Sequence, residues 1–273
     1  MNLYSNLAAI KDSLGITATT HDTRLLAILE SASRVIDKYC DRHFYVKSET
    51  KYFDGRTPLP IKDLLSIDTD GLTTDSDGDA TFENTFATTD YILYPLNIFP
   101  KTLIELSADS DYGNFGYSKK GCSIAGLWGY GDGISATPYT NSGDEVEDTG
   151  GISDTATSIT VTDADNFSPG QTILIESEQC YISAFNTTTN ILTVTRAVNG
   201  TTGATHAKDT DIYIYDYPAD IEQVCLSLAE KIFVTRGKGF KSERLGDYSY
   251  TKEDGSISEP EMTLLSKFRR LKV

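Results

Sequence analysis

The chain has 273 residues, of which 39% are hydrophobic, enough to build one large domain or two smaller ones around a buried core. Its formal net charge of −16 argues against a DNA-binding surface, because neutralising phosphates requires a surplus of lysine and arginine. No apolar run is long enough to span a membrane, and the first residues lack the basic region and apolar core of a signal peptide. We therefore expect a globular protein that has no membrane segment and is not exported by the usual route.

Residues 22–40 show the strongest local pattern and predict an amphipathic helix. At its start, Asp22 can accept a hydrogen bond from a free backbone N–H group of the first turn. Apolar side chains then recur at three- and four-residue spacing, which places them on one helical face. They are Leu25, Leu26, Leu29, Ala32, Val35, Ile36 and Tyr39. A shorter helix is expected over residues 3–14, with Gly15 just beyond its end.

From about Lys47 the apolar period changes to two, which predicts β-strands between residues 48 and 130. The short connections between these strands favour antiparallel pairing. Turns are expected at three Asp-Gly pairs, which are Asp54-Gly55, Asp70-Gly71 and Asp77-Gly78.

Residues 132–151 are polar, acidic and rich in glycine and serine, so they are expected to form a boundary. Beyond them, segments rich in Thr, Ile, Val and Tyr predict a second group of strands, with turns at residues 168–170 and at Asn199-Gly200. The aromatic residues of this part are expected in its core or in strand pairs rather than on a sugar-binding platform. They are Phe167, Tyr181, Phe185, Tyr213, Tyr215 and Tyr217.

A third helix is predicted over residues 219–236, preceded by Pro218, and is expected to pair with the 22–40 helix. Its apolar face consists of Ile221, Val224, Cys225, Leu228, Ala229, Ile232 and Phe233. Residues 238–256 are polar and contain glycine, so they are expected to form an extended arm or a loop.

Residues 259–273 predict a C-terminal helix with acidic residues at its start and basic residues at its end, which suits the helix dipole. Its apolar stripe consists of Leu264, Leu265, Phe268 and Leu271, and its basic residues are Lys267, Arg269, Arg270 and Lys272. Two interpretations remain open. The helix folds back onto its own body, or it docks in a groove on a partner.

The residues that could carry chemistry form no known catalytic motif. His21, His43 and His206 are far apart in sequence, and no serine or cysteine motif of a nucleophile accompanies them. No glycine-rich nucleotide-binding motif occurs either. We therefore expect neither an enzyme nor a bound cofactor.

Metal binding is likewise not expected. Cys40 and His43 have the spacing of half a zinc site, but no second pair follows. Asp75, Asp77 and Asp79 could offer oxygens to calcium, yet alanine and phenylalanine occupy the two diagnostic positions of the calcium loop. An acidic hairpin turn is the favoured interpretation. The four scattered cysteines are expected to be small buried residues in a reducing compartment.

The order of many weak motifs resembles that of the phage head-tail connector (adaptor) proteins of the gp6-like family. At the amino-terminal end the motif residues are Tyr4, Leu7, Ile10, Lys11, Leu14, Gly15, Ile16, Asp22, Leu25, Leu26, Ala32, Ile36, Asp37, Tyr39, Cys40, Arg42 and Phe44. Further along they lie in residues 52–55, 61–64, 90–95, 128–131 and 246–249. The resemblance covers most of residues 1–131 and 216–250. A looser resemblance links residues 158–207 to a small all-β module of phage structural proteins.

This resemblance implies an α+β fold, a helical bundle packed with an antiparallel β-sheet, plus an inserted small all-β domain. The connector core would comprise residues 1–145 and 216–273, and the inserted module residues 146–215. The protein would be a structural component of the virion neck that is assembled in the host cytoplasm. It would form a ring, typically dodecameric, between the portal protein and the tail or neck (stopper or terminator) proteins. DNA would cross the ring without specific binding during genome packaging and ejection.

Within this interpretation we expect the C-terminal helix to bind the portal, because a basic amphipathic helix at the end of an acidic chain suits an acidic groove. The expected portal-binding residues are Leu264, Leu265, Lys267, Phe268, Arg269, Arg270 and Leu271. The alternative is an accessory virion protein that binds glycans or another partner through its β module.

Overall fold

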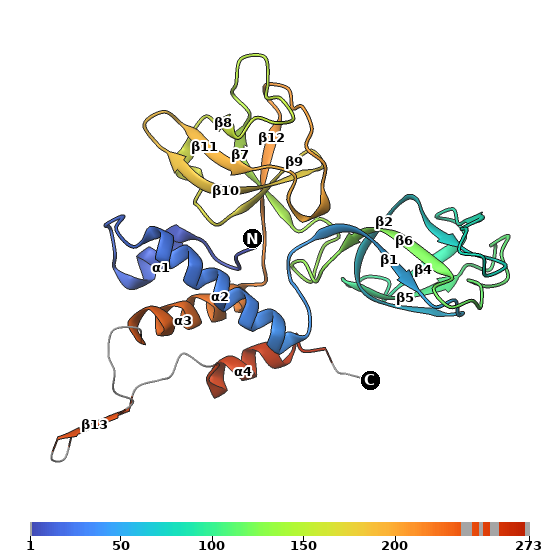
Figure 1. The fold of residues 1–273 in the computed structure, drawn as a ribbon, viewed down its shortest axis with the longest axis horizontal. Helices are drawn as coiled ribbons and strands as arrows, with labels where there is room; N and C mark the ends of the chain where they lie inside the picture. The colour runs from blue at the N-terminus through green and yellow to red at the C-terminus, as the bar shows by residue number, and fades with distance from the viewer. Residues whose placement is uncertain (1, 236–241, 246–247, 252–256, 271–273) are drawn as a thin grey trace. The chain divides into compact units, whose positions relative to one another are not determined.

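The computed structural model describes residues 2–235, 242–245, 248–251 and 257–270. Within these residues the chain forms four α-helices and two six-stranded antiparallel sheets, which confirms the predicted α+β class (Figure 1). The chain divides into two compact units. One unit contains the helices and the second sheet, whereas the other contains the first sheet together with residues 199–201.

The first two helices are α1 (Leu7–Leu14) and α2 (Asp22–Cys40). Helix α1 starts later than the predicted residue 3, because Asn6 caps it by accepting a hydrogen bond from the Ala9 amide at 3.0 Å. It ends at Gly15, which has a φ of 64°, as predicted.

Helix α2 has the predicted bounds, but Asp22 does not cap it. The N-cap position is occupied by His21, which makes no capping hydrogen bond. Asp22 is the first helical residue, and its carboxylate pairs with Lys11 of α1 at 2.9 Å. The acidic side chain therefore joins two helices while it also favours the positive end of the helix dipole.

Helix α3 (Ala219–Thr235) packs against α2, as predicted. The contact includes the Cys225 thiol, which lies 3.5 Å from the Ser33 hydroxyl and 3.9 Å from the Leu29 carbonyl oxygen. Buried apolar residues of both helices form this interface, namely Leu25, Ile28, Leu29, Ala32 and Ile36 on α2, and Ile221, Val224, Cys225, Leu228 and Ala229 on α3.

The first sheet consists of β1 (Lys47–Phe53), β2 (Leu59–Thr74), β3 (Asn84–Thr85), β4 (Tyr91–Tyr94), β5 (Lys101–Leu106) and β6 (Cys122–Trp128). Its strand order is β1-β6-β2-β5-β4, and β3 pairs with the end of β2. The single tryptophan, Trp128, is buried in the core of this sheet, and its indole N–H donates to the Glu49 carbonyl oxygen at 2.9 Å.

Of the three turns predicted at Asp-Gly pairs, the one at Asp70-Gly71 is wrong. Strand β2 continues through this pair, with a register shift between Ile67 and Leu72. Asp70 adopts a φ of 58°, and a Cβ at Gly71 would collide with the carbonyl oxygen of Ala125 in β6. The Asp-Gly pair therefore lies in an irregularity inside a long strand, a place where these residue types are also favoured.

The second sheet consists of β7 (Tyr139–Glu145), β8 (Ser158–Thr160), β9 (Thr172–Ile175), β10 (Glu178–Asn186), β11 (Ile191–Thr195) and β12 (Asp211–Tyr215). Its strand order is β7-β12-β9-β10-β11-β8, and short 3-10 helices precede β9 and follow β11. It has an apolar core of its own, which includes Ile159, Ile173, Ile182, Leu192 and Ile212.

Strand β7 lies inside the predicted boundary of residues 132–151. It is an edge strand, paired only with β12 in the sheet, and the rings of Tyr139 and Tyr215 meet edge to face at 5.0 Å. Its sequence carries few apolar residues because an edge strand with one exposed face needs little burial to pair. For this reason the sequence pattern predicted a boundary where the structure has the strand β7.

The turn at residues 168–170 connects the second sheet to α1. The amides of Leu7 and Ala8 donate to the Pro169 carbonyl oxygen at 2.9 Å and to the Ser168 hydroxyl at 3.0 Å. The first N–H groups of a helix have no partner within it, so this turn satisfies two of them. Gly170, with a φ of 101°, lets the backbone approach Leu3 and Leu26.

The predicted arm contains a hairpin of β13 (Ser242–Leu245) and β14 (Tyr248–Thr251), which pair antiparallel. Residues 246 and 247 of the family motif lie outside the described residues. Helix α4 (Glu259–Ser266) follows and contacts α2 and α3.

Candidate assembly surface

The C-terminal helix α4 begins with a capping box. The backbone N–H of Ser258 donates to the Glu261 carboxylate at 2.7 Å, and the Ser258 hydroxyl contacts the same carboxylate at 2.9 Å. Pro260 lies in the first turn, where its missing N–H costs nothing. Local sequence thus fixes the start of α4 at the expected place.

Glu261 then attaches α4 to α3. Its buried carboxylate accepts a hydrogen bond from Ser227 at 2.5 Å, and both of its oxygens accept from the Lys231 ammonium at 3.0 Å. Burial alone would raise the pKa of Glu261, but the bonds from Ser227, Ser258 and Lys231 lower it below its usual value. The ionised carboxylate is therefore a fixed anchor of the helix.

The structure places the expected portal-binding residues in three environments. Leu265 and Phe268 are buried against the chain's own body, and Leu264 and Arg270 are half-buried. Lys267 and Arg269 are exposed. Leu271 lies outside the described residues.

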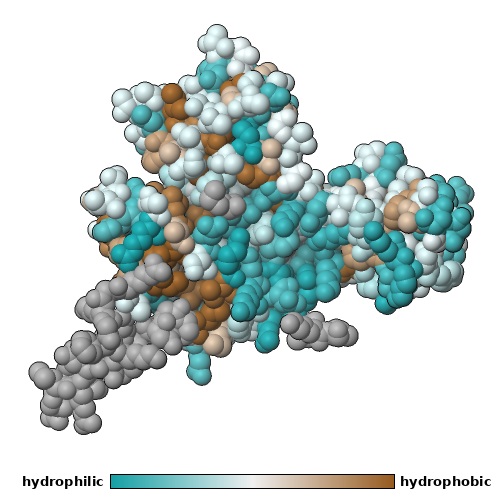
Figure 2. All heavy atoms as spheres, viewed as in Figure 1, coloured by the Kyte–Doolittle hydropathy of each residue, from teal (hydrophilic) through white to brown (hydrophobic). Residues whose placement is uncertain are grey.

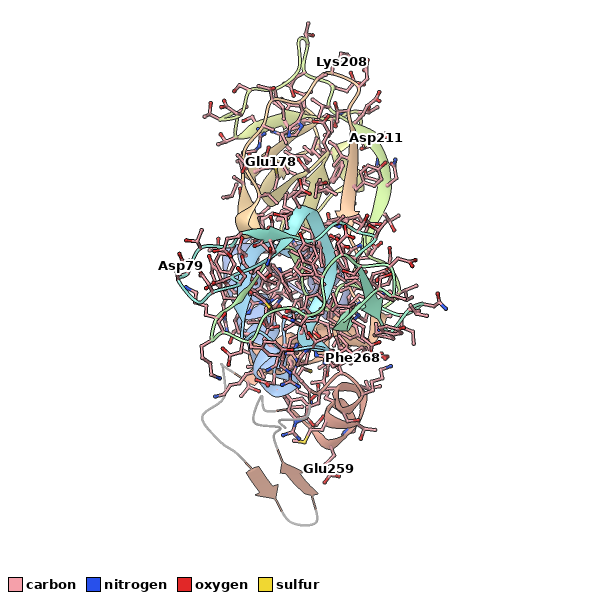
Figure 3. All side chains as sticks on the ribbon, turned by 90° about the vertical axis from the view of Figure 1, so that its right-hand side faces the viewer. Asp79, Glu178, Lys208, Asp211, Glu259 and Phe268 are labelled. Atoms are coloured by element: carbon pink, nitrogen blue, oxygen red, sulfur yellow. The ribbon has the colours of Figure 1, made fainter. Side chains whose placement is uncertain are left out.

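Backbone and side-chain contacts hold this C-terminal segment in place. The Arg270 amide donates to the Cys40 carbonyl oxygen at 2.9 Å, Lys267 pairs with Asp220 of α3, and the Arg269 guanidinium lies over the Tyr39 ring at 5.6 Å. Of the two open interpretations, the structure therefore has the helix folded back onto α2 and α3. Figure 3 labels Glu259 and Phe268 at the two ends of this segment.

The three histidines have separate surroundings. The His21 ring meets Phe233 of α3 edge to face at 5.6 Å, and the His43 ring stacks on Tyr45 at 4.6 Å. Burial lowers the pKa of His43. Cys40, which has the spacing of a zinc partner for His43, is a buried thiol. Burial raises the pKa of Cys40 to about 12, so the thiol is protonated at neutral pH.

Two acidic groups could in principle offer oxygens to a cation. Ligand atoms of Asp75, Asp77, Asp79 and Glu83 lie within 4.8 Å of one another. The Asp75 carboxylate, however, accepts the amides of Asp77, Gly78 and Ala80 at 3.2, 2.6 and 3.0 Å, which closes an acidic loop of the predicted kind.

The second acidic group consists of Glu145, Glu147 and Asp209. The Lys208 ammonium lies 2.6 Å from both the Glu147 and the Asp209 carboxylates and neutralises part of their charge. This group is thus a surface ion-pair cluster.

Sequence reasoning missed the polar network inside the second sheet. Glu178 is fully buried and accepts hydrogen bonds from Arg196 and from the amides of Ala197 and Ala204, and His206 contacts it at 3.0 Å (Figure 3). Arg196 and His206 both lie in the segment that resembles the phage module. Two polar residues that bracket a glycine-rich loop were the available signal.

The amino-terminal end of the chain is anchored to α2. The Tyr4 amide donates to the Ser33 hydroxyl at 3.0 Å, and the Tyr4 hydroxyl bonds to Asp37. Residues 4–96, which run from this anchor to the end of β4, match the family model described as phage gp6-like head-tail connector protein. The predicted resemblance is confirmed for this connector segment.

The match gives 93 of the 273 residues a similarity to phage head-tail structural proteins, which are components of the virion. The matched family is structural, and the expectation that the chain is not an enzyme stays a prediction. No curated protein matches the chain. Among the helices that the structure describes, none is both long and apolar enough to cross a bilayer.

Proposed function

We propose that the protein is a head-tail adaptor that forms a ring, of twelve copies, between the portal and the tail or neck proteins. The observation that carries this proposal is the match of residues 4–96 to the gp6-like connector family. The ring is assembled in the host cytoplasm and surrounds the channel through which DNA enters during packaging and leaves during ejection.

The charge of the chain supports this role. It has 40 acidic and 24 basic residues, so a ring of such subunits repels phosphates on average. DNA then passes through the channel without specific binding. Binding to DNA gains free energy when protein cations displace the counterions of the phosphates, and an acidic subunit offers few such cations.

In the proposed architecture, the four helices form a bundle that belongs with the first sheet as the connector core, residues 1–145 and 216–273. Residues 146–215 are an inserted all-β module. The separate apolar core of the second sheet supports this assignment. Its aromatic residues give no support to the alternative of a glycan platform, because Phe167, Tyr181 and Tyr215 are buried.

Removal of the module tests the insertion. Because β7 pairs with β12, the cut should take out residues 139–216 as a whole and join the ends with a short linker. The shortened chain loses the cap on Leu7 and Ala8 but is expected to form the same ring as the full chain. An insoluble or unfolded product would contradict the insertion.

For the portal contact we propose the exposed side of the C-terminal segment, with Lys267 and Arg269 reaching the portal and Leu264, Arg270 and Leu271 beside them. Leu265 and Phe268 hold the segment in position. Deleting residues 260–273 would uncover apolar surface on α2 and α3, so a charge reversal is the sharper test.

Arg269→Glu is the variant of choice, because Arg269 is exposed and its removal leaves the buried contacts of α4 intact. We expect an unchanged fold and weaker binding to the portal. Lys119→Glu is the matched control, since its side chain is 90% exposed in the first sheet unit. Equal binding by the two variants would mean that the portal contact lies elsewhere.

Mass photometry of the purified chain, alone and with the portal protein of the same genome, tests the adaptor role as a whole. The proposal predicts binding of about one copy for each portal subunit. If the two proteins do not associate at any salt concentration, the adaptor role is wrong. Binding of the full chain to a glycan array would then favour the accessory-protein alternative.

A further inference from the structure

The outer face of α3 is only partly covered by other described elements, since Glu230 meets Ser13 of α1 and Ser227 meets Glu261 of α4. Ala219, Glu222, Gln223, Leu226 and Glu230 recur at helical spacing on the side opposite the residues buried against α2. Together with Ser227 they line a shallow groove of about 470 Å³. Figure 2 shows hydrophobic residues gathered over the region of α3 and α4. The groove thus combines two carboxylates with the apolar side chains of Ala219 and Leu226.

The charge of this groove is negative and poorly compensated. Although Glu222 is exposed, the protein around its carboxyl group and the nearby Asp216 raise its pKa to about 7. Glu230 accepts a hydrogen bond from the neutral Ser13 hydroxyl. A cationic partner at this groove would stabilise both carboxylates in their ionised form.

The outer face of α2 has the complementary character. Arg24, Ala27, Ser31, Val35 and Lys38 are all exposed and recur at three- and four-residue spacing along the helix. The stripe has a cation at each end and no acidic residue between them. Its centre consists of small side chains and of Val35, which is 38% exposed, so another helix can approach closely.

Over most of their length the two faces lie on opposite sides of the helix pair, because α2 and α3 bury their apolar sides in one shared interface. Near the start of α2 the stripe reaches α3, where the Arg24 guanidinium lies over the Phe233 ring at 4.9 Å. A subunit that offers different surfaces on opposite sides makes heterologous contacts, and such contacts generate a closed ring when the rotation between subunits closes.

We propose that the acidic groove on α3 of one copy receives the basic outer face of α2 of a second copy. This inference rests on the proposed ring and assigns its subunit interface. Arg24 and Lys38 of one copy meet Glu222 and Glu230 of its neighbour, and Leu226 packs on the small residues at the centre of the α2 stripe.

Charge reversal of each face in the full chain tests this assignment. Glu222→Lys with Glu230→Lys makes the groove basic, and Arg24→Glu with Lys38→Glu makes the α2 stripe acidic. Either variant alone is expected to assemble at least about tenfold less, by mass photometry at raised concentration or on the portal, because like charges then face each other. An equimolar mixture should recover rings, because each reversed face meets a complementary one.

The control Asp12→Lys with Asp109→Lys changes the net charge as much as the groove variant does, at two exposed positions outside both faces. It should assemble like the unmodified chain. Loss of assembly in one reversed variant only, or a mixture that stays apart, would overturn the α2–α3 contact.

Cysteine cross-linking gives a second measurement that does not depend on repulsion. The four native cysteines are buried, so cysteines introduced at Ser31 and Gln223 are the accessible ones. Under oxidation the double variant should form a ladder of covalent oligomers, whereas each single variant should not. Rings that form without this ladder would overturn the interface but leave the adaptor role standing. An unmodified chain that never self-associates would overturn both.

Discussion

Glu178 and Arg196 form a two-pronged ion pair in the interior of the second sheet, with Arg196 Nε 2.7 Å from Glu178 Oε1 and Arg196 Nη2 2.5 Å from Glu178 Oε2. Arg196 also donates to the carbonyl oxygens of Ser153, Ala156 and Ala204. The pair therefore holds two separate loops, the one before β8 and the one after β11, around one buried carboxylate. Such a pair is costly to form but strongly destabilising to break, because the remaining partner is left buried without compensation.

Glu178→Gln should consequently destabilise the second sheet by about 3–5 kcal/mol, because it leaves the buried Arg196 guanidinium without a counter-charge. Urea denaturation followed by circular dichroism measures the change. Glu176→Gln is the matched control, since Glu176 is 60% exposed and touches His206 alone among these groups. The control should cost no more than about 1 kcal/mol. Equal losses in the two variants would show that the network does not hold the sheet.

The same network predicts a dependence on acid. Burial alone would raise the pKa of Glu178, but the hydrogen bonds from Arg196, Ala204, His206 and Ala197 lower it from 4.5 to about 2. Because the folded-state pKa is the lower one, the carboxylate stabilises the fold fully above about pH 4.5 and loses this contribution as the pH falls toward 2.

Thermal unfolding of the unmodified chain and of Glu178→Gln between pH 6 and pH 2.5 measures this contribution. The difference in midpoint should be large at pH 6 and should shrink steadily below pH 4.5. A difference that stays constant down to pH 2.5 would mean that the carboxylate does not titrate in this range, contrary to its surroundings.

In the first sheet, Gly126 of β6 lies against the backbone of β2. A Cβ at this position would collide with the Ser66 carbonyl oxygen and lie 3.1 Å from the Ile67 Cα atom. Gly126→Ala should therefore push the two strands apart and destabilise this unit by about 1–3 kcal/mol. Gly113→Ala is the control, because nothing lies within 4 Å of a Cβ there. The fluorescence of Trp128 reports the unfolding of this sheet, and identical midpoints for the two variants would contradict the close approach.

The sequence was sufficient to predict those elements that are determined by residues close together in the chain. The spacing from Leu25 to Ile36 defines one helical face, and Gly15 ends α1 because its φ is positive, so both were predictable. Tertiary context decided the rest. Asp70-Gly71 can form a turn or an irregularity inside a strand, and only its pairing with β6 selects the irregularity. The edge strand β7 likewise depends on a partner far away in the chain, the strand β12.

The candidate assembly surface was also predictable only in part. The amphipathic pattern around Leu265 and Phe268 indicated that α4 packs on something, but it could not say whether the surface belonged to the chain or to a partner. The Glu178 network was not predictable because its members are brought together by strand pairing, and an isolated glutamate in a strand carries no signal of burial.

The attachment of α4 leads to the last prediction. Leu265 is buried between α4 and the α2–α3 pair, so Leu265→Ala should cost about 2–5 kcal/mol of local stability and increase the opening of the C-terminal segment. Met262→Ala removes a side chain of similar size from the same helix, but Met262 is 40% exposed and should have a much smaller effect. Hydrogen exchange of the α4 amides in the full chain measures the opening.

Tryptic cleavage after Lys267 and Arg269 should accelerate in the Leu265→Ala variant alone, because a protease needs the segment detached from α2. Portal binding can then be compared between the two variants. If the proposed contact uses the folded-back segment, Leu265→Ala should weaken portal binding by the free energy needed to dock the segment again. If the portal instead binds the released segment, the same variant should strengthen binding, since the docking cost to be overcome is smaller.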